Sequence, residues 1–295
     1  MTGEPLRLAV AAMGTRFELA LVAGHGDLRA AGEMALEEIE SCHRLFSRFA
    51  PDSLLSHINR TAARSAVRLD RATCELFDEA LEVWRASGGA FDITVAPAMA
   101  QIGFGDSAVP ASAGRVGSAS ILLDPDRWSI RFSGPHVCLD LGGIAKGHAL
   151  DRAASLLREA GVTCALLHGG TSSIVAIGAP DGGDGWRVAI GRQPDACAVV
   201  LRDTAMSVSD PAAQSTGFQD CGHMIDPRTG TAVAAGARTV VIGPSARLAD
   251  AWSTALAVLG QVPPGFPAGW CAMFLPTLAH LEYPIRARTP QPLVV

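Results

Sequence analysis

Apolar residues near the start of the chain follow two different periods. Two apolar runs, Leu6–Ala11 and Arg16–Val22, are predicted strands, and Met13-Gly14-Thr15 joins them because glycine permits a tight backbone turn. Apolar positions then recur at helical spacing between Asp27 and Phe46, and Asp27 is a suitable N-cap. The chain therefore opens with a predicted strand pair and an amphipathic helix.

Helical spacing returns only three times in the rest of the chain. We expect helices at Arg71–Ser87, which ends at a glycine pair, and at about Lys146–Ala160 and Ala246–Leu259. The segment SRFAPDSLLSHINR breaks the pattern and is expected to be an ordered loop. Short strand-like runs fill the remainder: Ile121–Leu123, Trp128–Phe132, Val137–Leu139, Cys164–Leu167, Ile174–Ile177, Trp186–Ile190, Ala198–Leu201 and Arg238–Ile242. Strands and helices do not alternate regularly, which predicts an α+β fold of mixed β-sheets with packed helices.

Length and composition indicate one folded domain. The 295 residues are 48% hydrophobic, which is enough to bury one large core or two linked smaller cores. The Gly-, Ala- and Ser-rich stretch Gly103–Gly117 is the best candidate for a boundary between two lobes. We therefore expect a single domain over residues 1–295, with a possible lobe boundary near 103–117.

Charge and cysteine usage exclude several classes of protein. The formal net charge of -5 comes with no basic stripe, which disfavours a nucleic-acid partner and a polybasic membrane anchor. No apolar run approaches the roughly 20 residues of a membrane span, and the N-terminus lacks the apolar core of a signal peptide. The seven cysteines form no C-x-x-C pair, as is typical of reduced thiols. These features predict a cytoplasmic location.

The segment DLGGIAKGHALD, Asp140–Asp151, carries the first candidate chemistry. It follows the apolar run Val137–Leu139 and leads into the helix predicted from about Lys146. Amides at a helix N-terminus carry partial positive charge, so together with the Lys146 ammonium they could bind phosphate. The spacing matches neither G-x-G-x-x-G nor a P-loop. A strand-turn-helix joint with solvated charges is the alternative.

Two further segments carry candidate chemistry. In HMIDPRTG, a turn stabilised by Asp226 explains Asp226-Pro227 but leaves His223 and Arg228 unexplained. In ADAWSTALAVLG, Asp250 and Thr254 stand four apart and therefore share one side of a helix. Both oxygens could face a hard cation such as magnesium, or Thr254 could bond back to the Asp250 carbonyl.

Taken together, these segments resemble the FAD:protein FMN transferase family, the flavin transferases of the ApbE type. The resemblance extends along nearly the whole chain and rests on the order and spacing of its motifs. The matching motifs are MGTRFEL (Met13–Leu19), LFSRFAPDSLLSHIN (Leu45–Asn59), GGAFDITVAP (Gly88–Pro97), DLGGIAKGHALD, LLHGG (Leu166–Gly170), HMIDPRTG and ADAWSTALAVLG (Ala249–Gly260).

The resemblance implies an activity and its partners. The expected reaction transfers FMN from FAD to a threonine hydroxyl of an acceptor flavoprotein, releases AMP and requires Mg²⁺, with Mn²⁺ as the other ion that an oxygen-rich site could take. It also implies a two-lobed architecture with the nucleotide site in the cleft. Many relatives carry a lipoprotein signal, whereas this sequence shows none, so we expect a cytoplasmic transferase with no membrane segment.

The resemblance also assigns roles to residues of this sequence. It implies metal ligands at Asp250, Thr254 and the main-chain carbonyl of Ala145. Lys146 would lie near the phosphates, and His223 is the candidate base, since an unperturbed pKa of about 6.5 suits proton transfer near neutrality. Asp226 would orient its turn, with a direct catalytic role left open. The positions matched to the FAD site are Met13, Thr15, Phe49, Asp140, Gly142, Gly143, Lys146, Gly169, Gly170 and Arg228. Asp92 and Thr94 could equally be structural.

The chain departs from the family pattern at three places. SVSDPAAQ, Ser207–Gln214, stands where a T-S-G-D-Y-like stretch is usual, Thr171-Ser172-Ser173 stands where an Asp or Asn is frequent, and Ile102 replaces a frequent Trp. The first departure concerns one wall of the flavin or acceptor site. Two alternatives therefore stay open: a hydrolase that splits FAD into FMN and AMP, and a non-catalytic FAD-binding protein.

Overall fold

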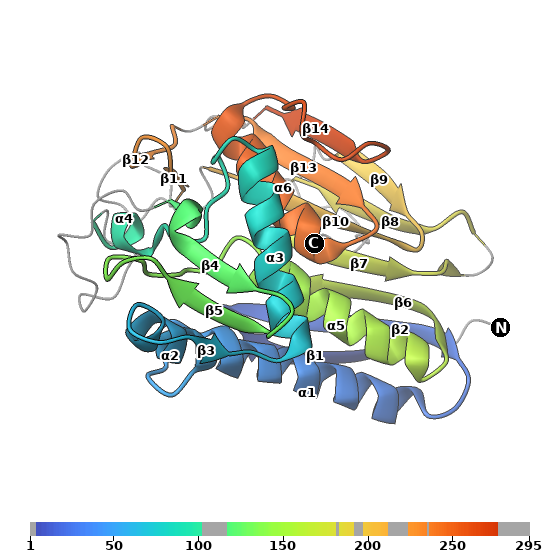
Figure 1. Ribbon diagram of the computed structural model, residues 1–295. Helices are drawn as coiled ribbons and strands as arrows, with labels where there is room; N and C mark the ends of the chain where they lie inside the picture. The colour runs from blue at the N-terminus through green and yellow to red at the C-terminus, as the bar shows by residue number, and fades with distance from the viewer. Residues whose placement is uncertain are drawn as a thin grey trace.

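A seven-stranded antiparallel sheet organises the computed structural model (Figure 1), which describes residues 4–101, 117–180, 183–191, 197–211, 224–234 and 236–276. The strand order is β1-β2-β6-β7-β10-β13-β14, and neighbouring strands run in opposite directions. The strands are β1 (Leu6–Ala12), β2 (Thr15–Gly24), β6 (Val162–Gly169), β7 (Ser173–Ile177), β10 (Thr204–Ser209), β13 (Arg238–Gly243) and β14 (Cys271–Leu275).

The two faces of this sheet bury different partners, because side chains alternate along each strand. One face packs against the helices α1 (Leu28–Phe46), α5 (Ala145–Glu159) and α6 (Ala246–Leu259), and α3 (Arg71–Ala86) joins the same core. The other face packs against the two-stranded ribbon of β8 (Trp186–Ile190) and β9 (Cys197–Leu201). In β6, for example, Leu167 belongs to the first core and Leu166 to the second.

Smaller elements gather toward the left of the view in Figure 1. They comprise α2 (Leu54–Thr61), α4 (Ala96–Gln101), the short 3₁₀ helix η1 (Ser118–Ser120), the sheet of β3 (Val67–Arg68), β5 (Ser129–Phe132) and β4 (Ile121–Asp124), and the hairpin of β11 (Ile225–Asp226) and β12 (Thr231–Ala232). Within the described ranges, no helix combines the length and the apolar character that crossing a membrane requires.

The structure confirms the predicted α+β class and most of the predicted elements. The first two strands form an antiparallel hairpin whose turn residues, Met13 and Gly14, have φ angles of 50° and 72°. The next helix begins after Asp27, whose carboxylate accepts hydrogen bonds from the amides of Arg29 and Ala30. The predicted lobe boundary at 103–117 lies almost entirely outside the described residues, and the two-lobed arrangement stays a prediction.

Two predictions of local structure were wrong. The expected loop at 47–60 contains α2, which begins at Leu54 because the Ser53 hydroxyl accepts a hydrogen bond from the Ser56 amide. The run Val137–Leu139 belongs to no strand among the described residues. Instead, the Asn59 side chain accepts a bond from the Leu139 amide at 2.8 Å and donates one to the Leu139 carbonyl at 3.1 Å. The Asn59 side-chain amide thus makes the two hydrogen bonds that a neighbouring strand would make to Leu139.

The helices α5 and α6 meet at their N-terminal ends, and each caps the other. Asp151 of α5 accepts hydrogen bonds from the amides of Ala246 at 2.9 Å and Arg247 at 3.0 Å. Asp250 of α6 accepts one from the amide of Gly147 at 3.1 Å. The backbones approach so closely that a Cβ at Gly147 would overlap the carbonyl oxygen of Ala246. Glycine is therefore required at this crossing for packing.

Gly147→Ala should lower the free energy of unfolding by about 1–3 kcal/mol, because the added methyl forces the two helix backbones apart. The sign is informative, since alanine is intrinsically better than glycine inside a helix by about 1 kcal/mol. Urea unfolding measures the change. Gly32→Ala in α1 is the matched control: its methyl would meet the side-chain ends of Leu8 and Leu21 and no neighbouring backbone, so the loss should be smaller. A Gly147→Ala protein as stable as the wild type would contradict the requirement.

Candidate functional site

The Asp250 carboxylate lies at the crossing of α5 and α6 and is only 3% exposed. Its Oδ1 accepts hydrogen bonds from the hydroxyls of Ser207 at 3.0 Å and Ser173 at 3.3 Å. Its Oδ2 faces the opposite way, toward the Gly147 amide. Strands β7 and β10 and helix α5 thus all hold one buried acidic group.

A cationic side chain stands beside this carboxylate. The Lys146 Nζ lies 3.7 Å from Asp250 Oδ2 and donates a hydrogen bond to the Gly142 carbonyl at 3.2 Å. A buried charge is costly unless a partner compensates it, so the position next to Oδ2 favours positive charge. We call Asp250, Lys146 and Thr254 the Asp250 site.

Thr254 joins this site from the next turn of α6. Its hydroxyl donates to the Asp250 main-chain carbonyl at 3.1 Å, as the structural alternative predicts. A Cβ at Gly143 would lie 3.3 Å from the Thr254 Oγ1, so the glycine loop passes directly over this hydroxyl. Ala145 is the first residue of α5 and is buried. The structure therefore brings Gly143, Lys146, Asp250 and Thr254 together.

The residues present fit a hard divalent cation. Their donors are all oxygen: a carboxylate, a hydroxyl and the main-chain carbonyls of the glycine loop, the set that Mg²⁺ prefers. Within the described ranges, no three His, Cys, Asp or Glu side chains cluster in a way that could hold a metal ion. A cation at Asp250 would thus have one acidic protein ligand, a pattern typical of Mg²⁺ sites completed by waters and substrate phosphates.

Asp140 fixes the shape of the glycine loop. Its Oδ2 forms an ion pair with the Arg48 guanidinium at 2.7 Å, and its Oδ1 accepts a bond from the Gly142 amide at 2.7 Å. Arg48 also lies over the Phe49 ring, 4.7 Å from its centroid, while Phe49 is 67% exposed. A large exposed aromatic ring thus stands beside the residue that anchors the loop, and its contact with flavin or adenine stays a prediction.

Two turns bring together the remaining residues matched to the FAD site on the main sheet. Gly170 at the end of β6 packs so tightly on the β1–β2 hairpin that a Cβ would overlap the Thr15 hydroxyl. A Cβ at Gly169 would lie 2.7 Å from the Phe17 ring. Both glycines therefore have a packing role. Met13 belongs to the same hairpin turn, where its amide donates to the Nδ1 of His43 at 3.2 Å.

The HMIDPRTG segment forms a charged turn, as far as it is described. The Arg228 guanidinium donates two bonds to the Asp226 carboxylate, at 2.9 and 2.8 Å, and these hydrogen bonds lower the pKa of Asp226 below its usual value. The Asp226 carbonyl also accepts the Gly230 amide at 2.8 Å. Asp226 and Arg228 are thus engaged with each other. His223 lies outside the described residues.

Asp92 and Thr94 have a structural role. The Asp92 carboxylate accepts four hydrogen bonds, two from the amide and hydroxyl of Thr94 and two from those of Ser118, at 2.6–3.0 Å. These bonds fasten the FDITVAP loop to the start of η1. These contacts give Asp92 and Thr94 a structural role, and they do not test the functional alternative.

Comparison with known proteins shows the family. The profile of the ApbE family matches residues 13–263, most of the 295-residue chain. The chain belongs to the ApbE family.

Its similarity to individual members is modest in identity and broad in coverage. A FAD:protein FMN transferase of Klebsiella pneumoniae is 28% identical over 243 residues, 76% of this chain and 69% of that protein. One from Haemophilus influenzae is 28% identical over 276 residues, 84% of this chain and 79% of that protein. Both support the resemblance inferred from the motifs.

Solved structures agree with the fold. The flavin transferase ApbE of Vibrio cholerae, in a histidine-to-glycine mutant form, is 25% identical with a TM-score of 0.76 and covers 88% of each chain. The ApbE protein of Thermotoga maritima gives 25% and 0.77, with 87% of each chain covered. The apo flavinyl transferase ApbE of Pseudomonas stutzeri is 23% identical with a TM-score of 0.79, covering 95% of this chain and 93% of that one, and supports the fold alone.

Sequence reasoning missed two residues of this ApbE-family site. Ser173 and Ser207 contact Asp250, yet both stand in segments that depart from the family pattern. Strand β10 was not predicted, because TAMSVS carries a weak apolar alternation. The sequence signal that could have found them is that both departures from the family pattern introduce serines, whose hydroxyls can donate to an acidic group such as Asp250.

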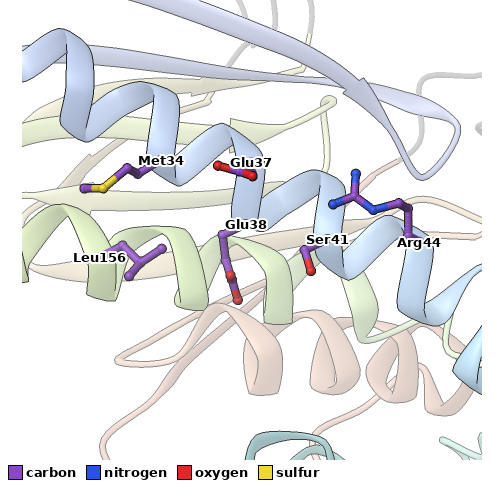
Figure 2. A pocket seen from close by; sticks show the side chains of 6 residues that line it. All are labelled: Met34, Glu37, Glu38, Ser41, Arg44 and Leu156. Atoms are coloured by element: carbon purple, nitrogen blue, oxygen red, sulfur yellow. The ribbon is translucent and has the colours of Figure 1, made fainter.

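A pocket on another part of the protein is separate from the candidate site. Figure 2 shows it between α1 and α5, and its walls are Met34, Glu37, Glu38, Ser41, Arg44 and Leu156. None of these is a predicted site residue. Two glutamates would repel a nucleotide's phosphates, so the pocket does not suit FAD.

His148, the histidine of the glycine-rich motif, is buried next to the site. Its ring packs edge-on against Phe46 with centroids 5.6 Å apart, and its buried Nδ1 has no hydrogen-bond partner within the described residues. Burial, reinforced by Arg247 and Arg152 and opposed by Asp70, lowers the pKa of His148 to about 3. The imidazole is therefore neutral in the folded protein at ordinary pH.

His148→Leu should flatten the dependence of stability on pH. As the pH falls below about 6.5, the unfolded chain takes up a proton that folded His148 refuses until its pKa of about 3, so stability present above pH 6.5 is lost on acidification. In the variant, the free energy of unfolding should fall less steeply on acidification, by up to about 1.4 kcal/mol per pH unit. Urea unfolding at pH 7.5, 6.5 and 5.5 measures it. An unchanged slope, or an imidazole that NMR shows titrating near 6.5 in the folded protein, would contradict the assignment.

Proposed function

We propose that this chain is a Mg²⁺-dependent FAD:protein FMN transferase. It moves FMN from FAD to a threonine hydroxyl of an acceptor flavoprotein and releases AMP. The observation that carries the proposal is the Asp250 site, where a buried carboxylate, a lysine and the N-terminus of α5 converge beneath the glycine loop. The named activity of the relatives at 28% identity supports it. The cytoplasmic location stays a prediction from the sequence.

The reaction exchanges one phosphorus–oxygen bond for another. The threonine oxygen bonds to the phosphorus of the FMN half of FAD, the pyrophosphate bond to AMP breaks, and the hydroxyl proton passes to a base. Mg²⁺ bound at Asp250, Thr254 and the Ala145 carbonyl would neutralise charge that develops on the phosphate oxygens. The chain itself must hold the pyrophosphate in line with the acceptor oxygen.

In this proposal, the glycine loop binds that pyrophosphate. Gly142 and Gly143 let the backbone approach closely, and the Lys146 ammonium is close enough to Asp250 to serve phosphate and cation together. The exposed Phe49 ring, stacked on Arg48, offers a flat surface for an aromatic ring of FAD. In this proposal, Met13, Thr15, Gly169 and Gly170 also contribute to the FAD site, from the β1–β2 turn and the end of β6 that pack on each other.

His223 remains the candidate base, on the strength of its motif. Asp226 is a poor alternative, because its hydrogen bonds with Arg228 lower its pKa and leave it a weak acceptor of protons at neutrality. In this proposal, Asp226 and Arg228 shape the turn that presents His223.

The decisive experiment incubates the purified chain with FAD, Mg²⁺ and a flavoprotein domain that carries a threonine acceptor motif. We expect the acceptor to gain the mass of an FMN group, AMP to be released, and chelator to abolish both. AMP without the mass gain would indicate the hydrolase, and intact FAD bound to the protein would indicate the non-catalytic FAD-binding protein. The intact mass of the acceptor and chromatography of the nucleotides measure the outcome.

Asp250→Asn should reduce Mg²⁺-dependent turnover by about 100-fold or more, because it removes a ligand charge while keeping the side-chain volume. The transfer assay across a Mg²⁺ titration measures the loss, with circular dichroism to check the fold. Asp70→Asn is the matched control, since asparagine keeps the N-cap of α3 and should leave turnover unchanged. Wild-type turnover of Asp250→Asn at ordinary Mg²⁺ would refute the ligand assignment.

A further inference from the structure

The two serines that contact Asp250 form a pair across two strands. Ser173 of β7 and Ser207 of β10 stand directly opposite each other in the antiparallel register, so their side chains share one face of the sheet. Both are fully buried, and both hydroxyls donate to the same oxygen, Asp250 Oδ1, at 3.3 and 3.0 Å. The central sheet thus holds one oxygen of a helix-borne carboxylate.

A third serine supports this pair from α6. The Ser253 hydroxyl lies 3.2 Å from the Ser207 hydroxyl and 3.0 Å from the Asp250 main-chain carbonyl, and its one proton can be donated to either. The Ser207 hydroxyl itself donates to the Asp250 carboxylate. Ser253 is fully buried as well, and its carbonyl accepts a bond from Thr239 of β13 at 2.7 Å. Ser207 is therefore enclosed between the Asp250 carboxylate and Ser253.

The two oxygens of Asp250 consequently face different surroundings. Oδ1 is held by the strands, whereas Oδ2 faces the Gly147 amide and the Lys146 ammonium, on the side of the glycine loop. Without the two hydroxyl donors, the buried Oδ1 would have lost these hydrogen bonds, and the carboxylate could rotate to exchange its two oxygens. The serine pair removes that freedom.

We propose that Ser173 and Ser207 are positioning residues that aim the Asp250 carboxylate at the cation of the proposed transferase site. The inference rests on the proposed function, because it takes Asp250 as a cation ligand. Neither serine touches the substrate; each acts through Asp250, as the groups behind metal ligands commonly do. Because both hydroxyls bond to one oxygen, either serine alone retains part of the effect.

The test measures binding of Mn²⁺, a paramagnetic probe for the Mg²⁺ position, to the full chain by electron paramagnetic resonance, with Mg²⁺ as competitor. Ser173→Ala and Ser207→Ala should each weaken Mn²⁺ binding a few-fold. The double variant should weaken it by about 10- to 100-fold, the usual cost of removing the groups that orient a metal ligand. Turnover of the double variant should recover at saturating Mg²⁺, because the ligand itself is intact.

Ser118→Ala is the matched control. It removes a hydroxyl donor from another buried carboxylate, Asp92, and so carries a comparable loss of stability with no change expected in Mn²⁺ affinity. If the double alanine variant fails to fold, Ser173→Cys with Ser207→Cys replaces it, since a thiol is somewhat larger than a hydroxyl, leaves no cavity and donates only weakly.

The outcomes separate the inference from the function on which it rests. Wild-type protein that binds Mn²⁺, combined with a double variant of equal affinity, would overturn the serine assignment and leave the transferase proposal standing. Wild-type protein that binds no Mn²⁺, with or without FAD, would overturn both. A weakened double variant that saturating Mg²⁺ cannot rescue would show a structural role in place of positioning.

Discussion

The crossing of α5 and α6 is the contact on which the candidate site depends. Each helix supplies an aspartate to the free amides at the other's N-terminus: Asp151 caps α6, and Asp250 caps α5. This exchange is possible only because Gly147 lets the backbones touch. The N-termini of α5 and α6 therefore lie close together, and both contribute partial positive charge there. The fold thus creates an anion-binding position before any side chain is considered.

Asp250 changes the character of that position. The Asp250 carboxylate lies at the N-terminus of α5, where the helix amides carry partial positive charge, and its Oδ2 accepts a hydrogen bond from the Gly147 amide. The neighbouring Lys146 ammonium supplies a formal positive charge in the same space. In the proposed site, the substrate phosphates, the cation and the Lys146 ammonium would alternate in charge. A buried setting strengthens each of these attractions, because water screens them less.

The sequence predicts the turns and helix starts that neighbouring residues determine. It does not predict the contacts between segments that are distant along the chain. The hairpin at Gly14 and the helix behind Asp27 are set by neighbouring residues, and the structure confirms both. The Asn59 amide that pairs with Leu139 comes from 80 positions away, so an apolar run looked like a strand although its partner is a side chain. The Ser173–Ser207 pair depends likewise on a strand register that no local pattern encodes. Of the candidate site, the glycine loop and the Asp250–Thr254 spacing were readable, whereas the hydroxyls behind them were not.

The two interpretations of Thr254 prove compatible once its hydrogen bond is examined. Its hydroxyl proton points to the Asp250 carbonyl at 3.1 Å, as expected for a threonine that merely bonds back along its helix. That bond uses the proton and leaves lone pairs on the oxygen, which also lies 3.5 Å from the Ser209 hydroxyl. The glycine loop is close enough that a Cβ at Gly143 would lie 3.3 Å from this oxygen. A cation coordinates lone pairs and repels the proton, so in the proposed site the bond to the helix would orient the hydroxyl for coordination. The structural role of Thr254 is in this way the physical basis of the proposed functional one.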